Sequence, residues 1–350
     1  MKIGIAGAGL LGRLLALHLV RQGHEVHVFD LASGPLARGA AGWTAAGMLS
    51  PTAELESADE NIFRQGLRSI ELWSQIIPGL NQPVSLTHAG SLLLAHRTDT
   101  GAAMRIVGLL EQKAPVDHKP RALSPAELSE LEPCIHGPGR AWLLPHEGHL
   151  NTVEAMAALQ SSAVGTQWHW NTPVVQLESG RLITATGSHS FDHVFDTRGT
   201  GMREAGRPFD AHDVNCLNVR GVRGEIFWLH APGVTLNRPV RLLHPRHRVY
   251  VVPRSNNIIV VGASEIESED RSPASLRTTV ELLAAAHSML PALAEARVVH
   301  SETNLRPALA DNLPRIEHQA GLTRINGLFR HGWLIAPAVV EEALNTFSGH

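Results

Sequence analysis

The first 30 residues alternate two short apolar runs with one amphipathic segment. Residues 2–6 and 25–30 read as strands, the second with Val26, Val28 and Phe29 for burial. Between them, apolar side chains recur at helical spacing over residues 10–21, and Gly23 follows where a helix usually ends. The pattern therefore predicts a strand, a helix and a second strand, the opening of a βαβ unit.

Further along the chain, helical and strand patterns are mixed. We predict helices over residues 61–77, from Ser124-Pro125, from Asn151 with Glu154 as a capping box, over 275–289 and over 337–347. We predict strands over residues 226–229, 249–252 and 258–261, the last two joined by a hairpin turn at 254–257. These strands imply an antiparallel sheet in the second half of the chain.

Composition excludes several classes of function. The 350 residues are 43% hydrophobic, enough to bury the core of one large domain or two intertwined ones, and we favour two. A formal net charge of -3 without basic runs argues against a nucleic-acid partner.

No segment approaches the roughly 20 uninterrupted apolar residues of a membrane span. Cys134 and Cys216 are too few for a secreted disulfide scaffold, so we expect a cytoplasmic protein. Histidine is frequent, at 21 residues, but His146/His149 and His244/His247 lack the helical i, i+4 context of a zinc pair, so we expect no metal.

A glycine-rich turn joins the first predicted strand to the first helix. In Gly7-Ala8-Gly9-Leu10-Leu11-Gly12, the three glycines permit a tight turn, close approach of a pyrophosphate and close packing of helix on strand. Asp30 ends the next strand, where a carboxylate can accept hydrogen bonds from ribose hydroxyls. The motif predicts a dinucleotide site without distinguishing FAD from NAD.

The choice between FAD and NAD rests on three further segments that resemble those of a known family. They are the small-residue segment 44–49, the Arg-Pro segment 304–307 with the Asp-x-x-Pro turn at 311–314, and the glycine-flanked segment 327–337. Together with the glycine-rich turn, they resemble the glycine oxidase and D-amino-acid oxidase family of flavoproteins, and are most similar to the glycine oxidases of thiamine biosynthesis. The resemblance implies a flavoenzyme that binds FAD non-covalently.

The resemblance also implies an α/β fold, in which a Rossmann-like FAD-binding domain of the GR2 type is interleaved with an α+β substrate domain built on an antiparallel sheet. We expect residues 1–82, 146–215 and 300–350 in the first domain and residues 83–145 and 216–299 in the second. The expected FAD-binding residues are Gly7, Gly9, Leu10, Leu11, Gly12, Asp30, Leu31, Thr44, Ala46, Gly47, Met48, Val174, Leu328, Phe329, His331, Gly332, Trp333 and Leu334.

The substrate site is expected to contain four polar side chains. Arg306 and Arg330 resemble the family positions that contact a substrate carboxylate, which a planar guanidinium binds bidentately. Tyr250, the only tyrosine, matches a hairpin tyrosine that closes over the substrate. Glu265 is expected on the same hairpin, where it either binds a substrate ammonium group or points to solvent.

The implied reaction is oxidation of a small amino acid at the carbon next to nitrogen. Glycine is the first-choice substrate and would give glyoxylate, ammonia and hydrogen peroxide, with oxygen or another compound as electron acceptor. Leu328 replaces a histidine common in glycine oxidases, and His331 and Trp333 also depart from the pattern. Three alternatives therefore remain: a D-amino-acid or secondary-amine oxidoreductase, a non-catalytic flavin-binding partner protein and, as an outsider, an NAD-dependent dehydrogenase. A homo-oligomer is compatible with all of them.

Overall fold

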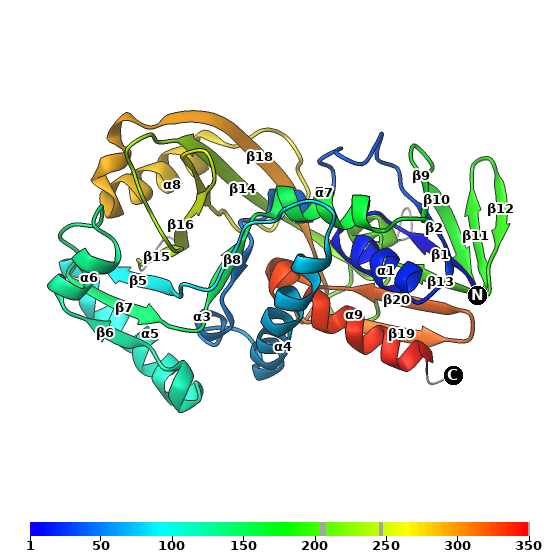
Figure 1. The fold of residues 1–350 in the computed structure, drawn as a ribbon, viewed down its shortest axis with the longest axis horizontal. Helices are drawn as coiled ribbons and strands as arrows, with labels where there is room; N and C mark the ends of the chain where they lie inside the picture. The colour runs from blue at the N-terminus through cyan, green and yellow to red at the C-terminus, as the bar shows by residue number, and fades with distance from the viewer. Residues whose placement is uncertain (204–207, 245–247, 349–350) are drawn as a thin grey trace.

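Two large sheets lie toward opposite ends of the long axis of the molecule (Figure 1). The computed structural model describes residues 1–203, 208–244 and 248–348. The six-stranded sheet consists, in order, of β19 (Arg315–Gln319), β20 (Leu322–Asn326), β13 (His193–Asp196), β1 (Lys2–Ala6), β2 (Glu25–Phe29) and β9 (Gln167–His169). All neighbours in it run parallel except the hairpin pair β19–β20.

The predicted βαβ opening is confirmed. β1 is followed by α1 (Leu10–Arg21) and then by β2, which pairs with β1 in parallel. A parallel neighbour requires a crossover connection, and α1 provides it. Gly23, at φ +82°, follows the C-terminal cap residue Gln22 and has a conformation that glycine adopts without strain.

The eight-stranded sheet consists, in order, of β18 (Arg297–Ala308), β14 (Arg220–His230), β17 (Ile258–Gly262), β16 (Arg248–Arg254), β15 (Val240–Leu243), β5 (Ser91–Ala95), β7 (Arg140–Leu144) and β6 (Arg121–Leu123). The predicted hairpin is β16–β17, and Asn256 and Asn257 of its turn both have positive φ. The sheet is antiparallel except at β15–β5, which run parallel, and the long stretch of chain between these two strands provides the crossover that a parallel pair needs.

Helices cover the two sheets and form separate cores. α1, α4 (Glu60–Ile76), α7 (Thr152–Ser162) and α9 (Gly332–Ser348) pack together with β1 and β2. α8 (Leu276–Met289) packs against β16 and β17 of the other sheet, and α5 (Thr100–Lys113) packs against β5. Short helices are α2 (Ala41–Thr44), α3 (Pro51–Glu54) and α6 (Pro125–Leu131), and the small sheets contain β3 (Met48–Leu49), β4 (Leu86–Thr87), β8 (Gly148–Leu150), β10 (Val174–Glu178), β11 (Arg181–Thr184) and β12 (Gly187–Ser190).

The last helix begins five residues earlier than predicted. Proline is favoured in the first turn of a helix, and this placed the expected start at Pro337, but α9 begins at Gly332 and contains Pro337 in its interior. An interior proline leaves the carbonyl four residues before it without a helical partner. Here that carbonyl belongs to Trp333, and it accepts a hydrogen bond of 2.9 Å from Nε1 of Trp73 in α4.

The capping box predicted at α7 is also wrong in part. Asn151 caps the helix by accepting hydrogen bonds from the amides of Val153 and Glu154. The Glu154 carboxylate does not complete the box, because it accepts a hydrogen bond of 2.8 Å from the amide of Ser85. By contrast, the predicted helix at Ser124-Pro125 is confirmed as α6, with a complete capping box.

The expected domain boundary at residue 300 falls inside β18. This strand pairs with β14 along its whole length, so residues 300–308 belong to the eight-stranded sheet. Figure 1 shows β14 and β18 as long neighbouring strands that extend toward the six-stranded sheet. The division into two domains otherwise stays a prediction.

Within the described ranges, no helix is long and apolar enough to cross a membrane. In the same residues, no three His, Cys, Asp or Glu side chains are arranged to hold a metal ion. Cys134 and Cys216 are both free thiols.

Candidate functional site

A cavity of about 1350 Å³ connects the glycine-rich turn with one face of the eight-stranded sheet. All four expected substrate residues, Tyr250, Glu265, Arg306 and Arg330, line it. Of the expected FAD-binding residues, all except Gly12 line it as well. The structure therefore brings together positions that are more than 300 residues apart in the sequence.

The glycine-rich turn has the shape that the motif predicts. Gly7 has φ +101°, and a Cβ on Gly12 would lie 1.9 Å from the carbonyl oxygen of Gly7, so Gly12 lets α1 pack against the turn. A Cβ on Gly9 would have Ala40 as its nearest neighbour, at 3.7 Å, which leaves room beside the backbone. The first turn of α1 has free N–H groups and no side-chain cap, which suits a diphosphate.

Asp30 lies directly after β2 at the cavity wall. Its carboxylate accepts hydrogen bonds from the amides of Ala8, at 2.5 Å, and Ala32, at 2.7 Å. It therefore holds the glycine-rich turn in place in addition to the ribose contact expected of it. Leu31 and Val174 also line the cavity.

Arg13 is a residue of this wall that the sequence analysis missed. Its side chain is 1% exposed, and its nitrogens donate to the carbonyl oxygens of Ala8, Met156 and Pro35 at 2.7–2.8 Å. Burial lowers the pKa of the guanidinium to about 10, partly offset by the charge of Asp30. A buried cation beside this turn favours a negatively charged ligand such as a diphosphate. The available signal was a charged residue on the apolar face of α1.

The small-residue segment 44–49 runs from the end of α2 into β3. Gly47 has φ +73°, and a Cβ there would lie 2.3 Å from the carbonyl oxygen of Leu150. The need for glycine at this position thus comes from the backbone of β8. Arg254 donates hydrogen bonds to the carbonyl oxygens of Ala46 and Leu150 and joins this segment to the eight-stranded sheet.

Arg306 projects from β18 into the space above Gly224 of the neighbouring strand β14. A Cβ on Gly224 would lie 2.6 Å from the guanidinium, so glycine is needed to make room for it. Nη1 of Arg306 donates to the carbonyl oxygens of Ser264, at 3.0 Å, and Arg223, at 3.3 Å. Among the described residues, no carboxylate forms an ion pair with Arg306. The site therefore contains a guanidinium with bonding capacity left for a ligand.

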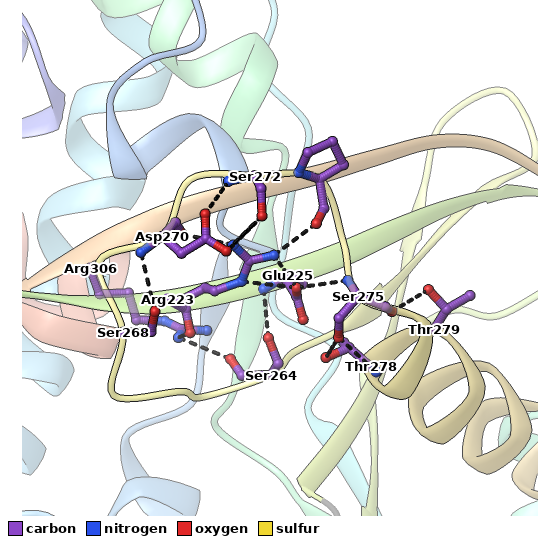
Figure 2. Close-up of polar contacts among 11 residues, drawn as sticks. Arg223, Glu225, Ser264, Ser268, Asp270, Ser272, Ser275, Thr278, Thr279 and Arg306 are labelled. Carbon is purple, nitrogen blue, oxygen red and sulfur yellow. Dashed lines mark hydrogen bonds and ion pairs between the residues drawn. The ribbon is translucent and has the colours of Figure 1, made fainter.

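A buried ion pair fixes the segment that surrounds Arg306 (Figure 2). Arg223 is 4% exposed and Glu225 is 0% exposed, and their side chains are bonded at 2.5 and 3.0 Å. Arg223 also donates to the carbonyl oxygens of Asp270, at 2.7 Å, and Pro273, at 2.8 Å. These contacts hold residues 264–275, which connect β17 to α8, against β14.

Tyr250 lies in the middle of the same sheet face. On β16 it is paired with Arg241 of β15 on one side and with Gly262 of β17 on the other. A Cβ on Gly262 would lie 2.7 Å from the Tyr250 hydroxyl, so the ring lies over the glycine. Burial raises the pKa of Tyr250, and the charges of Arg306 and Arg241 oppose this shift.

Arg330 is engaged in ion pairs within the protein. Its Nη2 lies 2.9 Å from the carboxylate of Glu54 and 2.6 Å from the hydroxyl of Ser57, and its Nη1 lies 3.7 Å from Glu265. Glu265 follows β17, so the expectation that it lies on the hairpin is wrong, and its side chain is 50% exposed. Glu265 contributes to the cavity wall and pairs with an arginine there.

Glu54 is the second residue that the sequence analysis missed. Its carboxylate, at the end of α3, is 3.1 Å from Nε2 of His331 and 3.5 Å from Arg241, in addition to Arg330. Burial alone would raise the pKa of Glu54, but the His331 hydrogen bond and the charges of Arg330 and Arg241 together hold it well below its usual value. No motif signalled this role, because its partners come from β15 and from the start of α9.

We expect Glu54→Gln to lower the free energy of unfolding by about 2 kcal/mol at pH 7, because a neutral amide cannot form the charge-assisted hydrogen bonds of the ionised carboxylate. A lowered pKa means that this stabilisation is complete above the usual pKa of a glutamate and is lost as pH falls through the folded-state value. The difference in the free energy of unfolding between wild type and variant, measured by urea unfolding, should therefore become smaller as the pH falls from 7 toward 3. Glu71→Gln, at an exposed ion pair with Arg68, is the control and should change stability by less than about 1 kcal/mol. A pH-independent difference would contradict this prediction.

The remaining expected residues lie at the start of α9. Leu328, Phe329, Gly332, Trp333 and Leu334 all line the cavity, and Phe329 has a positive φ of 48°. The Trp333 side chain is 3% exposed and donates from Nε1 to the carbonyl oxygen of Gly42, at 2.9 Å. This unusual tryptophan thus joins α9 to α2 and is part of the core.

Comparison with known proteins gives consistent relatives over nearly the whole chain. The provisionally named thiamine biosynthesis oxidoreductase ThiO of Rhizobium etli is 36% identical over 346 residues, which cover 98% of this chain and 95% of the relative. The glycine oxidase of Geobacillus kaustophilus is 25% identical over 350 residues, which cover 96% of this chain and 89% of the relative.

Solved structures share the fold. Glycine oxidase from Geobacillus kaustophilus superposes with a TM-score of 0.84 at 23% identity, covering 99% of this chain and 95% of that one. Iminodiacetate oxidase from Chelativorans sp. BNC1 gives the same TM-score and coverage at 24% identity. The α/β fold predicted from the sequence is thus confirmed.

A family model described as FAD dependent oxidoreductase matches residues 2–343. The glycine-rich turn, Asp30, the buried Arg13 and the volume of the cavity all fit the dinucleotide that this family uses. The chain belongs to the DAO family of FAD-dependent oxidoreductases.

Proposed function

We propose that the protein oxidises a small amino acid at the carbon next to its nitrogen, with glycine as the first-choice substrate. The observation that supports this most directly is Arg306, a guanidinium without a carboxylate partner among the described residues, in the same cavity as the dinucleotide turn. A guanidinium with free donors is suited to the carboxylate of an amino acid. The proposed products are glyoxylate, ammonia and hydrogen peroxide.

In this proposal Arg306 binds the substrate carboxylate and so fixes the position of the α carbon. FAD, bound non-covalently along the cavity, supplies the acceptor for a hydride from that carbon. Tyr250 covers the substrate from the sheet face. Glu265 stays close enough to the bound amine to influence its proton, because the amine must be neutral when the hydride leaves. Arg330 would have to share its guanidinium with Glu54, so we assign the main carboxylate contact to Arg306.

The relatives support a metabolic role and leave the acceptor open. Similarity to ThiO of Rhizobium etli suggests that the product serves thiamine biosynthesis. Oxygen is the proposed electron acceptor, although a quinone is an alternative. A homo-oligomer and a cytoplasmic location stay predictions.

Anaerobic mixing of the purified protein with glycine, sarcosine and D-alanine tests this function directly. We expect glycine to bleach the flavin absorbance, and air to restore it if oxygen is the acceptor. The substrate that bleaches fastest defines the size of side chain or nitrogen substituent that the cavity accepts. A yellow protein that none of the three bleaches would overturn the proposal and favour the non-catalytic alternative, whereas a colourless protein would contradict FAD binding.

A further inference from the structure

A second arginine in the substrate region of the cavity has little bonding within the protein. Arg241 lies on β15, lines the cavity and is 22% exposed at its side chain. Its only polar partner in the described residues is Glu54, at the long distance of 3.5 Å, and its buried Nε has no hydrogen-bond acceptor. Five N–H donors of a guanidinium are thus almost unused.

Arg330 is bonded within the protein much more fully than Arg241. Both arginines face Glu54, but Nη2 of Arg330 lies 2.9 Å from that carboxylate, and Arg330 also contacts Ser57 and Glu265. Glu54 therefore bonds mainly to Arg330 and His331, and the N–H donors of Arg241 remain available. The charge of Arg241 is balanced in part by Glu54 and by buried Glu147, whose pKa it lowers against the effect of burial. The N–H donors of Arg241, however, have no close acceptor among the described residues, so they can bind the oxygens of a ligand carboxylate.

The position of Arg241 relative to Arg306 defines what that ligand must look like. Arg241 is the direct cross-strand neighbour of Tyr250, and side chains in such pairs lie close together on one face of a sheet. The Arg306 guanidinium lies over Gly224 of β14 and the Tyr250 hydroxyl lies over Gly262 of the next strand, β17, and both side chains line the cavity. The two guanidiniums therefore lie near the same tyrosine, so one small molecule can contact both.

We propose that Arg241 forms a second carboxylate-binding subsite, and that substrates with a second carboxylate, on the nitrogen substituent or on the side chain, are preferred over matched substrates that lack it. The inference rests on the proposed function and refines its substrate class. Arg306 binds the carboxylate next to the reacting carbon, and Arg241 binds the other one. Glycine fills only the first subsite.

For iminodiacetate the chemistry balances with the proposed acceptor. The α carbon loses a hydride and the nitrogen loses a proton, which gives an imine. Water then cleaves the imine into glyoxylate and glycine, and the two electrons and two protons convert oxygen to hydrogen peroxide. The substrate nitrogen leaves with glycine, so no free ammonia forms in this turnover.

The test compares substrates that differ only in the second carboxylate. Iminodiacetate is paired with N-ethylglycine, and D-aspartate with D-alanine, and kcat/KM is measured for each with the intact holoenzyme. We expect the wild type to prefer the dicarboxylate of at least one pair by about 10- to 100-fold, the range for a charge-assisted hydrogen bond. The pair that shows the preference tells whether the second carboxylate belongs on the nitrogen or on the side chain.

Arg241→Gln should reduce that preference at least tenfold, and Arg241→Lys should retain part of it. The preference is a ratio within one variant, so a general loss of activity does not mimic the result. Arg121→Gln, which removes an exposed cation of β6, is the control and should keep the wild-type ratio. If Arg241→Gln binds FAD but turns over too slowly for kinetics, binding replaces turnover as the measurement. Succinate and butyrate do not react, and their dissociation constants can be measured from changes in flavin absorbance. The ratio of these two constants then reports the preference for the dicarboxylate in each variant.

Two outcomes overturn the inference while leaving the proposed function intact. In the first, glycine reduces the flavin but neither dicarboxylate is preferred by the wild type. In the second, the wild type shows a preference that survives Arg241→Gln. If no amine in the series reduces the flavin, the proposed function itself fails, and the inference fails with it.

Discussion

Replacing Arg306 with methionine is expected to lower kcat/KM for glycine about a thousandfold, or about 4 kcal/mol of transition-state stabilisation. The carboxylate would lose the guanidinium that fixes the α carbon, and a small misplacement of the reacting carbon slows the chemistry strongly. Arg306 forms no ion pair with a carboxylate in the described part of the chain, so its removal leaves no buried anion behind. The variant should fold and remain yellow, and steady-state kinetics on the flavin-loaded enzyme will measure the loss.

A substrate without a carboxylate provides the control for Arg306. Turnover of ethylamine, however slow in the wild type, should change little in Arg306→Met, because the missing contact is to the carboxylate alone. Arg306→Lys should recover part of the glycine activity, since an ammonium keeps the charge but not the bidentate geometry. A glycine kcat/KM within tenfold of the wild type in Arg306→Met would show that another residue binds the carboxylate.

Replacing Arg223 with methionine is expected to lower the free energy of unfolding by about 3–5 kcal/mol. The variant would leave Glu225, which is 0% exposed, without its cation, and would release the carbonyl oxygens of Asp270 and Pro273. These contacts hold residues 264–275 beside Arg306, as Figure 2 shows. Urea unfolding followed by tryptophan fluorescence measures the loss, and KM for glycine should rise as well.

The double variant Arg223→Met/Glu225→Leu distinguishes the free energy lost with the ion pair from the cost of leaving the Glu225 carboxylate buried without a cation. Because much of the expected loss comes from an unpaired buried carboxylate, the double variant should be more stable than Arg223→Met alone. Arg203→Met breaks an ion pair with Glu269 on the same segment at partly exposed side chains and should cost less than about 1 kcal/mol. Equal destabilisation in Arg203→Met and Arg223→Met would contradict this account.

Local sequence pattern was sufficient to predict the elements on either side of the glycine-rich turn. The strand, helix and strand of residues 2–30 were predictable because the apolar period, the glycine positions and the terminal Asp30 act within a few turns of chain. The β16–β17 hairpin was predictable for the same reason, since its Asn-Asn turn suits positive φ. The start of α9 was not, because the helix tolerates Pro337 only through Trp73, which is distant in sequence.

The sequence by itself thus determined the βαβ opening with its glycine-rich turn, since motifs and local periodicity encode it, and the resemblance gave the family and many of the residues around the cavity, though not Arg13 or Glu54. Only the tertiary structure decided which charges are available to a ligand. Arg306 and Arg330 look equivalent in the sequence, yet Arg330 is neutralised by Glu54 from α3, while Arg306 and Arg241 keep free donors. The physical reason is that ion pairing depends on distances of a few ångströms between segments that the fold brings together, and no local pattern records those distances.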